Sequence, residues 1–254
     1  MYSASVELFN KLDDYCDNLP ANRQETKPPL LIKGETGTGK SALLSNWIHR
    51  RERNSTRSKI HSPLGEEFMF WHAVGCSRQS MNANSLIRRL IVDLKNRFEL
   101  ARDIPKSQER LSWELPRFLE LAAKKGRVII VIDGLNRLVN NDNGEDGLTW
   151  LPLQFPPNVR FILSVTTPPS SYGENQKANT SEQNDKVSLH KNKKSRILQE
   201  LDRRNVPCII LKPLDRNLCR SVVDTFISKT VNNENAALTM GKHTLLTIIP
   251  LSYY

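Results

Sequence analysis

The sequence lacks any apolar run that could cross a bilayer and any paired-cysteine motif. No apolar stretch approaches the ~18 residues that a membrane helix requires, and no signal peptide begins the chain. The four cysteines, Cys16, Cys76, Cys208 and Cys219, show neither C-x-x-C nor Cys/His ligand spacing. We therefore expect a cytoplasmic protein with reduced thiols, no zinc site and no membrane span.

Aromatic residues are also few, at 7% of the chain, and they are not interleaved with the basic residues. The net charge of +10 could attract nucleic acid. However, the positive charge is spread out and crowds only at Arg50–Lys59 and Lys186–Arg196. Without an aromatic platform on which bases could stack, solvated basic loops, including one over Arg50–Gly65, are favoured over a nucleic-acid groove.

What the sequence does contain is the glycine-rich stretch GETGTGKS, which follows the apolar residues Pro29–Ile32 after the single residue Lys33. It fits the phosphate-binding pattern G-x-x-x-x-G-K-[ST], which joins a buried strand to a helix N-terminus. Glycines allow a tight path whose backbone N–H groups point at phosphate, and the helix dipole adds positive potential. We predict that ATP or ADP binds here, through Gly34, Glu35, Thr36, Gly37, Thr38, Gly39, Lys40 and Ser41.

A second motif is the aliphatic run RVIIVID, which ends in Asp133. Parallel α/β sheets bind ligands at the carboxyl ends of their strands, so an aspartate there can face the phosphate loop. We predict that Asp133 and the Ser41 hydroxyl hold Mg²⁺.

Five apolar runs alternate with segments of helical spacing, which indicates a parallel sheet in an α/β fold. The predicted strands are Pro29–Lys33, Phe68–Val74, Arg127–Asp133, Val159–Val165 and Val206–Leu211. Helices are predicted over residues 3–18, packed at the sheet edge, from Lys40, over Ser85–Phe98 and over Ser195–Arg204. The stretch Ser107–Lys125 contains Pro116, which predicts two short helices or one kinked helix.

Three smaller expectations concern single side chains. Asn84 is a plausible N-cap for the helix that follows it. Trp71 and His72 are expected in the core, as is Trp47 on the helix after the phosphate loop.

The chain is long enough for one α/β domain with appendages. We predict an N-terminal helix and linker over 1–28 and the nucleotide-binding domain over 29–230. Within it, the polar segment 168–194 is expected to be a disordered insertion. Asp215 is expected to cap a later helix, and 231–254 is expected to be a tail of a chain that looks truncated.

Several stretches together resemble the NACHT-type (STAND) signalling NTPases, and the nephrocystin type in particular. They are PLLIKGETGTGKSALLSNWI, HAVG, SLIRRL, RVIIVIDGLNRL, LPLQFPPNVRFILSV and LKPLD. The telomerase-associated NACHT proteins are similar over SWEL, VIDGLNRLV and FILSV. The resemblance implies a P-loop NTPase three-layer sandwich with a five-stranded parallel sheet of order 5-1-4-3-2. It also implies a nucleotide-dependent switch or scaffold that works with other ciliary, nephrocystin-type proteins in the cytoplasm and cilium.

The chain departs from that family at two positions. The resemblance implies that Asp133 and Asn136 are the candidate catalytic residues, but Asn136 stands where NACHT proteins have a second acid. Thr166-Thr167 stand where many relatives have an arginine. An amide does not take a proton from water, and a hydroxyl supplies no charge to a transition state. Acids of the next loop, Asp142, Glu145 or Asp146, are possible substitutes. We expect tight nucleotide binding with slow or no hydrolysis; the alternatives are an active ATPase acting on nucleic acid and a pseudo-ATPase interaction domain.

Overall fold

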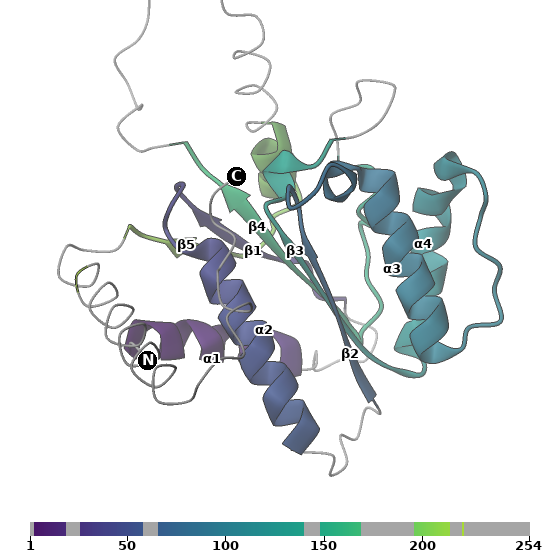
Figure 1. Cartoon of the computed structure of the whole chain (residues 1–254), viewed down its shortest axis with the longest axis horizontal. Helices are drawn as coiled ribbons and strands as arrows, with labels where there is room; N and C mark the ends of the chain where they lie inside the picture. The colour runs from purple at the N-terminus through teal and green to yellow at the C-terminus, as the bar shows by residue number, and fades with distance from the viewer. Residues whose placement is uncertain are drawn as a thin grey trace, which may run out of the picture. The chain divides into compact units, whose positions relative to one another are not determined.

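Five parallel strands form the sheet at the centre of the structure, a computed structural model (Figure 1). The structure describes residues 3–18, 26–57, 66–139, 148–168, 196–213 and 220. The chain divides into two compact units, Met1–Lys212 and Pro213–Tyr254. Nearly all of the second unit lies outside the described residues. Three predicted segments also lie outside the described residues: the insertion beyond Pro168, the helix capped by Asp215 and the tail.

The sheet has the order β2-β3-β4-β1-β5, and all neighbouring strands are parallel. This confirms the predicted fold class and strand order. The strands begin and end within two residues of their predicted bounds: β1 Leu30–Gly34, β2 Glu66–Ala73, β3 Gly126–Asp133, β4 Val159–Thr166 and β5 Cys208–Leu211. The near-continuous burial of β3 and β4 explains why their sequences are almost uninterruptedly apolar.

Helices cover both faces of the sheet (Figure 1). One face carries α1 (Ser3–Asp17) and α2 (Lys40–Arg57), and the other carries α3 (Ala83–Phe98) and α4 (Gln108–Ala123). A further helix over 196–203 contributes Ile197 and Leu201 to the core on the α3 side. The two cores hold the sheet rigidly between them, which fixes the positions of its carboxyl ends.

The prediction that α1 packs at the sheet edge is wrong. Phe9, Leu12 and Cys16 are buried beside α2, in one cluster with side chains of β1, β3 and β4. Because those strands are central in the sheet, α1 lies on its face. Burial raises the pKa of the Cys16 thiol to about 12.

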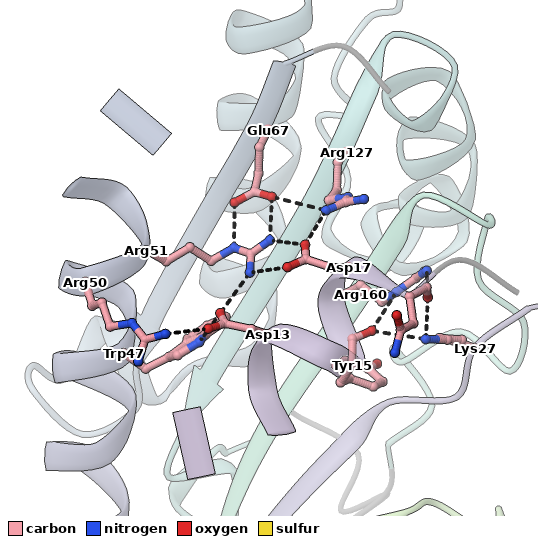
Figure 2. A network of polar contacts seen from close by, with 11 residues as sticks. Asp13, Tyr15, Asp17, Lys27, Trp47, Arg50, Arg51, Glu67, Arg127 and Arg160 are labelled. Atoms are coloured by element: carbon pink, nitrogen blue, oxygen red, sulfur yellow. Dashed lines mark hydrogen bonds and ion pairs between the residues drawn. The ribbon is translucent and has the colours of Figure 1, made fainter. Parts of the chain in front are cut away.

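The predicted basic loop over Arg50–Gly65 is also wrong for its first part, because α2 continues as a helix to Arg57. Arg51 donates two hydrogen bonds to the Glu67 carboxylate of β2, at 2.7 and 2.8 Å (Figure 2). It also donates to Asp17 of α1 at 2.6 Å. Arg50 pairs with Asp13 of α1 at 3.0 Å. Acids distant in the sequence therefore pair with the first two arginines of this basic stretch.

The C-terminus of α1 is anchored by two cations from other segments. Arg160 of β4 is 1% exposed, and its guanidinium donates to the Tyr15 and Asn18 carbonyls at 3.2 and 3.3 Å. Lys27 also donates to both carbonyls (Figure 2). These carbonyls are the groups that a helix end leaves unpaired, and they form the negative end of its dipole.

Three local expectations need correction. The N-cap of α3 is Asn82, whose side-chain oxygen accepts from the Ser85 N–H at 2.9 Å, while Asn84 lies inside the helix. Pro116 lies within one helix, α4, so the two-helix alternative is wrong. Trp71 is 41% exposed, because β2 is an outer strand of the described sheet. His72 and Trp47 are buried, as predicted.

Candidate functional site

The phosphate loop connects β1 to α2 and has the backbone geometry of an anion cradle. Gly37 and Gly39 have φ angles of +84° and +86°, which L-residues with side chains rarely adopt. Apart from each glycine and its two chain neighbours, no heavy atom lies within 4 Å of the point where a Cβ would stand on either glycine. The Thr38 hydroxyl closes the turn by donating to the Glu35 carbonyl at 2.9 Å. The path of the loop therefore depends on these two glycines.

Lys40 begins α2, and its side chain lies within the loop. Its Nζ donates to the carbonyls of Gly34 and Glu35 at 2.8 and 2.7 Å, and the residue is 8% exposed. Burial lowers the pKa of Lys40; the Asp133 charge opposes this shift and the Arg137 charge adds to it. The charges of Asp133 and Arg137 thus act on the Lys40 amine from the end of β3.

Asp133 is 8% exposed and is held by a serine of the neighbouring strand. The Ser164 hydroxyl donates to Asp133 Oδ1 and accepts from the Gly134 N–H at 2.8 Å. This fixes one carboxylate oxygen by a hydrogen bond at the carboxyl edge of the sheet. Ser41, the other expected Mg²⁺ ligand, is exposed in the first turn of α2. A carboxylate and a hydroxyl are oxygen donors of the kind that Mg²⁺ prefers, so these residues fit the ion.

Asn136 is buried and bonds the end of the neighbouring strand β4. It is 9% exposed, and its Oδ1 accepts from the Thr166 N–H at 3.0 Å. Thr167, the next residue, donates its N–H to the Gly34 carbonyl at 3.0 Å. Asn136 thus connects the turn after β3 to the end of β4. The residue after β4, Thr167, is in turn bonded to Gly34 at the start of the phosphate loop. This hydrogen bond holds Asn136 at the carboxyl edge of the sheet, and its candidate catalytic role stays a prediction.

Two residues at this edge were missed by reasoning from sequence. Ser164 holds Asp133, and the only signal for it was a hydroxyl within the apolar run of β4. Arg137 brings a positive charge that acts on Lys40, and a lone arginine after the aspartate motif carried no distinguishing pattern. Both are brought to the site by the parallel sheet, which places the ends of β1, β3 and β4 side by side.

Membrane spans and metal clusters are two other features that the described residues were expected to lack. No helix in these ranges is both long and apolar enough to cross a membrane. No three His, Cys, Asp or Glu side chains in the same ranges are grouped so that they could hold a metal ion by themselves. A magnesium ion shared with phosphate oxygens needs fewer protein ligands than such a group supplies.

A parallel sheet of this order, with a phosphate loop between β1 and α2, is the fold of the P-loop NTPases. Residues 7–148 match the family model of the AAA ATPase domain, and the chain belongs to this family.

Known relatives match about half of this chain. Human nephrocystin-3 is 36% identical over 149 residues, which cover 56% of this chain and 10% of the relative. Telomerase protein component 1 of Mus musculus is 28% identical over 142 residues, covering 54% of this chain and 5% of the relative. Drosophila ORC bound to DNA, a solved structure, has a TM-score of 0.47 and 15% identity, covering 93% of this chain and 50% of that chain. The chain thus spans a tenth or less of these curated relatives.

Proposed function

We propose that this protein is an ATP-binding regulatory module. In it, Lys40 binds the nucleotide phosphates and Asp133 holds the Mg²⁺ that accompanies them. The observation that carries the proposal is the buried Lys40 amine, held inside a loop of positive-φ glycines and within electrostatic reach of Asp133. Bound Mg²⁺ would neutralise part of the phosphate charge. Ser41 and Asp133 are the residues proposed to hold it.

Hydrolysis is proposed to be slow or absent. Asn136 is an amide, and its oxygen is already engaged by the Thr166 N–H. It therefore provides no base for the attacking water. Thr166 and Thr167 offer hydroxyls at the end of β4, which supply no positive charge to the transition state.

The wider role is proposed from the relatives. Nephrocystin-3, at 36% identity over 149 residues, supports a NACHT-type (STAND) switch or scaffold of nephrocystin type. By the same similarity, the proposed partners are ciliary proteins and the proposed location is the cytoplasm and cilium. These are proposals, because the similarity covers 10% of nephrocystin-3.

Thermal unfolding with nucleotide tests the binding site. A ligand that binds only the native state at 100 times its Kd stabilises it by about 2.7 kcal/mol. Mg·ATP should therefore raise the Tm of the wild-type protein, while Lys40→Ala should show no shift. Lys124→Ala, which removes an exposed lysine at the end of α4, is the charge-matched control and should respond like wild type. An unchanged response in Lys40→Ala would reject the site.

Hydrolysis is tested separately by phosphate release over many turnovers. We expect a rate far below one turnover per second, which is the low end of typical enzymes. Rapid turnover that Lys40→Ala abolishes would overturn the proposal of slow hydrolysis while leaving the binding site in place.

A further inference from the structure

The outer face of α4 carries an exposed tryptophan. Trp113 is 82% exposed, although tryptophan is a side chain that folding normally buries to a large extent. The buried residues of α4, such as Leu111 and Leu115, lie on the opposite side of the helix, so Trp113 is not part of the core. A single exposed apolar side chain is common on protein surfaces. Trp113 differs from that ordinary case through the groove and the charges beside it.

A groove of about 790 Å³ adjoins this tryptophan. It is lined by the segment 102–107, which connects α3 to α4, and by Glu109, Arg110 and Glu114 of α4. Glu109 and Arg110 are one turn before Trp113 and share its face of the helix. The tryptophan therefore stands at the rim of the groove.

Hydrogen bonds hold the non-helical wall of the groove in place. Arg88 of α3 donates to the carbonyls of Pro105 and Lys106 at 3.2 and 3.1 Å. Arg102 donates to the Glu114 carboxylate at 2.7 Å, which joins this wall to α4. A surface that is already ordered loses little conformational freedom when a partner binds, so the groove is suited to recognition.

The charges around the tryptophan that lack a partner are more often positive than negative. Arg110 and Arg117 lie one turn before and one turn after it, on the same side of its face. Neither these arginines nor Lys106 of the groove wall forms an ion pair with a residue that the structure describes. Glu109 and Glu120 are the unpaired acids nearby, and they lie on the other side of the tryptophan. The paired arginines therefore offer a site for carboxylates.

The same stretch of α4 contains a residue that weakens the helix. Pro116 lies within α4 and has no N–H, so the Ser112 carbonyl one turn earlier lacks its helical hydrogen bond. Departures from local rules that packing does not repay are expected where a protein has a function to perform. An interior proline and an exposed tryptophan within four residues therefore both point to a role for this face.

We propose that Trp113, Arg110, Arg117 and the adjoining groove, together the Trp113 surface, bind an acidic segment of a partner protein. An apolar side chain of that segment packs on the indole, and carboxylates on either side of it pair with the two arginines. Tryptophan and arginine are the residue types enriched at the centres of protein interfaces. Because α4 covers the face of the sheet away from α2, the inference goes beyond the proposed nucleotide site and does not depend on it (Figure 1).

The first test is a selection of random peptides displayed on phage. Peptides are selected for binding to the whole chain and counter-selected on Trp113→Ala. We expect the enriched peptides to carry Asp or Glu on both sides of an apolar residue. Enrichment of basic or uncharged peptides, or no enrichment that depends on Trp113, would overturn the proposal.

The most enriched peptide is then measured by calorimetric titration. Trp113→Ala should weaken binding at least about 30-fold, as at an interface hot spot, while its Tm stays within about 2 °C of wild type. Arg110→Ala and Arg117→Ala should each weaken binding about 3–10-fold, and less at high salt. The matched controls are Leu153→Ala, which removes a side chain that is 74% exposed and does not line the groove, and Arg53→Ala on α2. Both controls should bind as wild type does, and equal losses in the controls would reject the surface.

Sedimentation of the protein without peptide tests the other occupant, a second copy of this chain. The proposal expects wild type and Trp113→Ala to have the same mass. A dimer that wild type forms and Trp113→Ala loses would overturn the acidic partner and assign the surface to self-association. Because none of these measurements uses a nucleotide, their outcome is distinguishable from success or failure of the proposed function.

Discussion

Replacing Arg51 by alanine should destabilise the protein strongly, although Arg51 lies on a helix that looked like a basic loop in the sequence. The side chain is 11% exposed and bonds Glu67, which is 18% exposed, through both carboxylate oxygens. It also bonds Asp17, which is 50% exposed. Among the described residues, Arg127 still pairs with both acids when Arg51 is removed, at 2.6 Å from Asp17 and 3.6 Å from Glu67.

The magnitude follows from the burial of each arm. Breaking a buried ion pair on one side costs about 3–5 kcal/mol, whereas an exposed pair contributes about 0–1 kcal/mol. The Arg51–Glu67 pair is closer to a buried pair, and the Arg51–Asp17 pair is closer to an exposed one. We expect a loss of about 2–3 kcal/mol, which lowers Tm by roughly 5–10 °C in a domain of this size.

The assay is urea unfolding followed by circular dichroism, with Arg53→Ala as the matched control. Arg53 is exposed on the same helix, so its loss should change stability by less than about 0.5 kcal/mol. A double-mutant cycle with Glu67→Ala should return a coupling energy above about 1 kcal/mol. The reasoning is refuted if Arg51→Ala matches Arg53→Ala, or if the cycle shows no coupling.

The stability that is lost in Arg51→Ala should also depend on pH. Burial alone would raise the pKa of Asp17, but the hydrogen bonds and charges of Arg51 and Arg127 outweigh it and lower this pKa below 3.8. A group whose pKa is lowered in the folded state contributes its full stability above the unfolded value and loses it as pH falls through the folded value. The difference between wild type and Arg51→Ala should therefore be largest near neutral pH and narrow below about pH 4.

Two further predictions concern local structure. Asn82→Ala should cost about 1 kcal/mol in urea unfolding because it removes the cap of α3, whereas Asn84→Ala should cost clearly less; a reversed order would contradict the assigned cap. In a Cys219→Ser background, a thiol reagent at pH 8 should label the exposed Cys76 and Cys208. It should not label Cys16 until the protein unfolds, because that thiol is buried and its pKa is raised to about 12. Prompt labelling of three thiols would contradict the packing of α1.

Sequence alone predicted the sheet and the phosphate loop well, because both depend on patterns contained in short stretches. Buried parallel strands are apolar throughout, and the loop needs glycines at fixed spacing. Features that depend on distant partners were missed. The helical end of α2 is paired through Arg50 and Arg51 with acids of α1 and β2, up to 38 residues away.

At the site, the same distinction holds. Lys40 and Asp133 were identified from their motifs, but the Ser164 hydroxyl that holds Asp133 comes from a strand 31 residues further on. Asn136 was named as a candidate catalytic residue, but the hydrogen bond that its oxygen accepts from the end of β4 was not visible in the sequence. The residue type was visible in the sequence, but the direction of the side chain depends on the turn that Gly134 starts.

Calorimetric titration with ATP, with and without Mg²⁺, tests the central claim most directly. We predict saturable binding of one nucleotide per chain, strengthened by Mg²⁺, and lost in Lys40→Ala while that variant keeps its circular dichroism spectrum. Asp133→Asn should retain binding without Mg²⁺ and lose the strengthening by the ion. Wild-type protein that shows no heat of binding with either ATP or ADP would contradict the account.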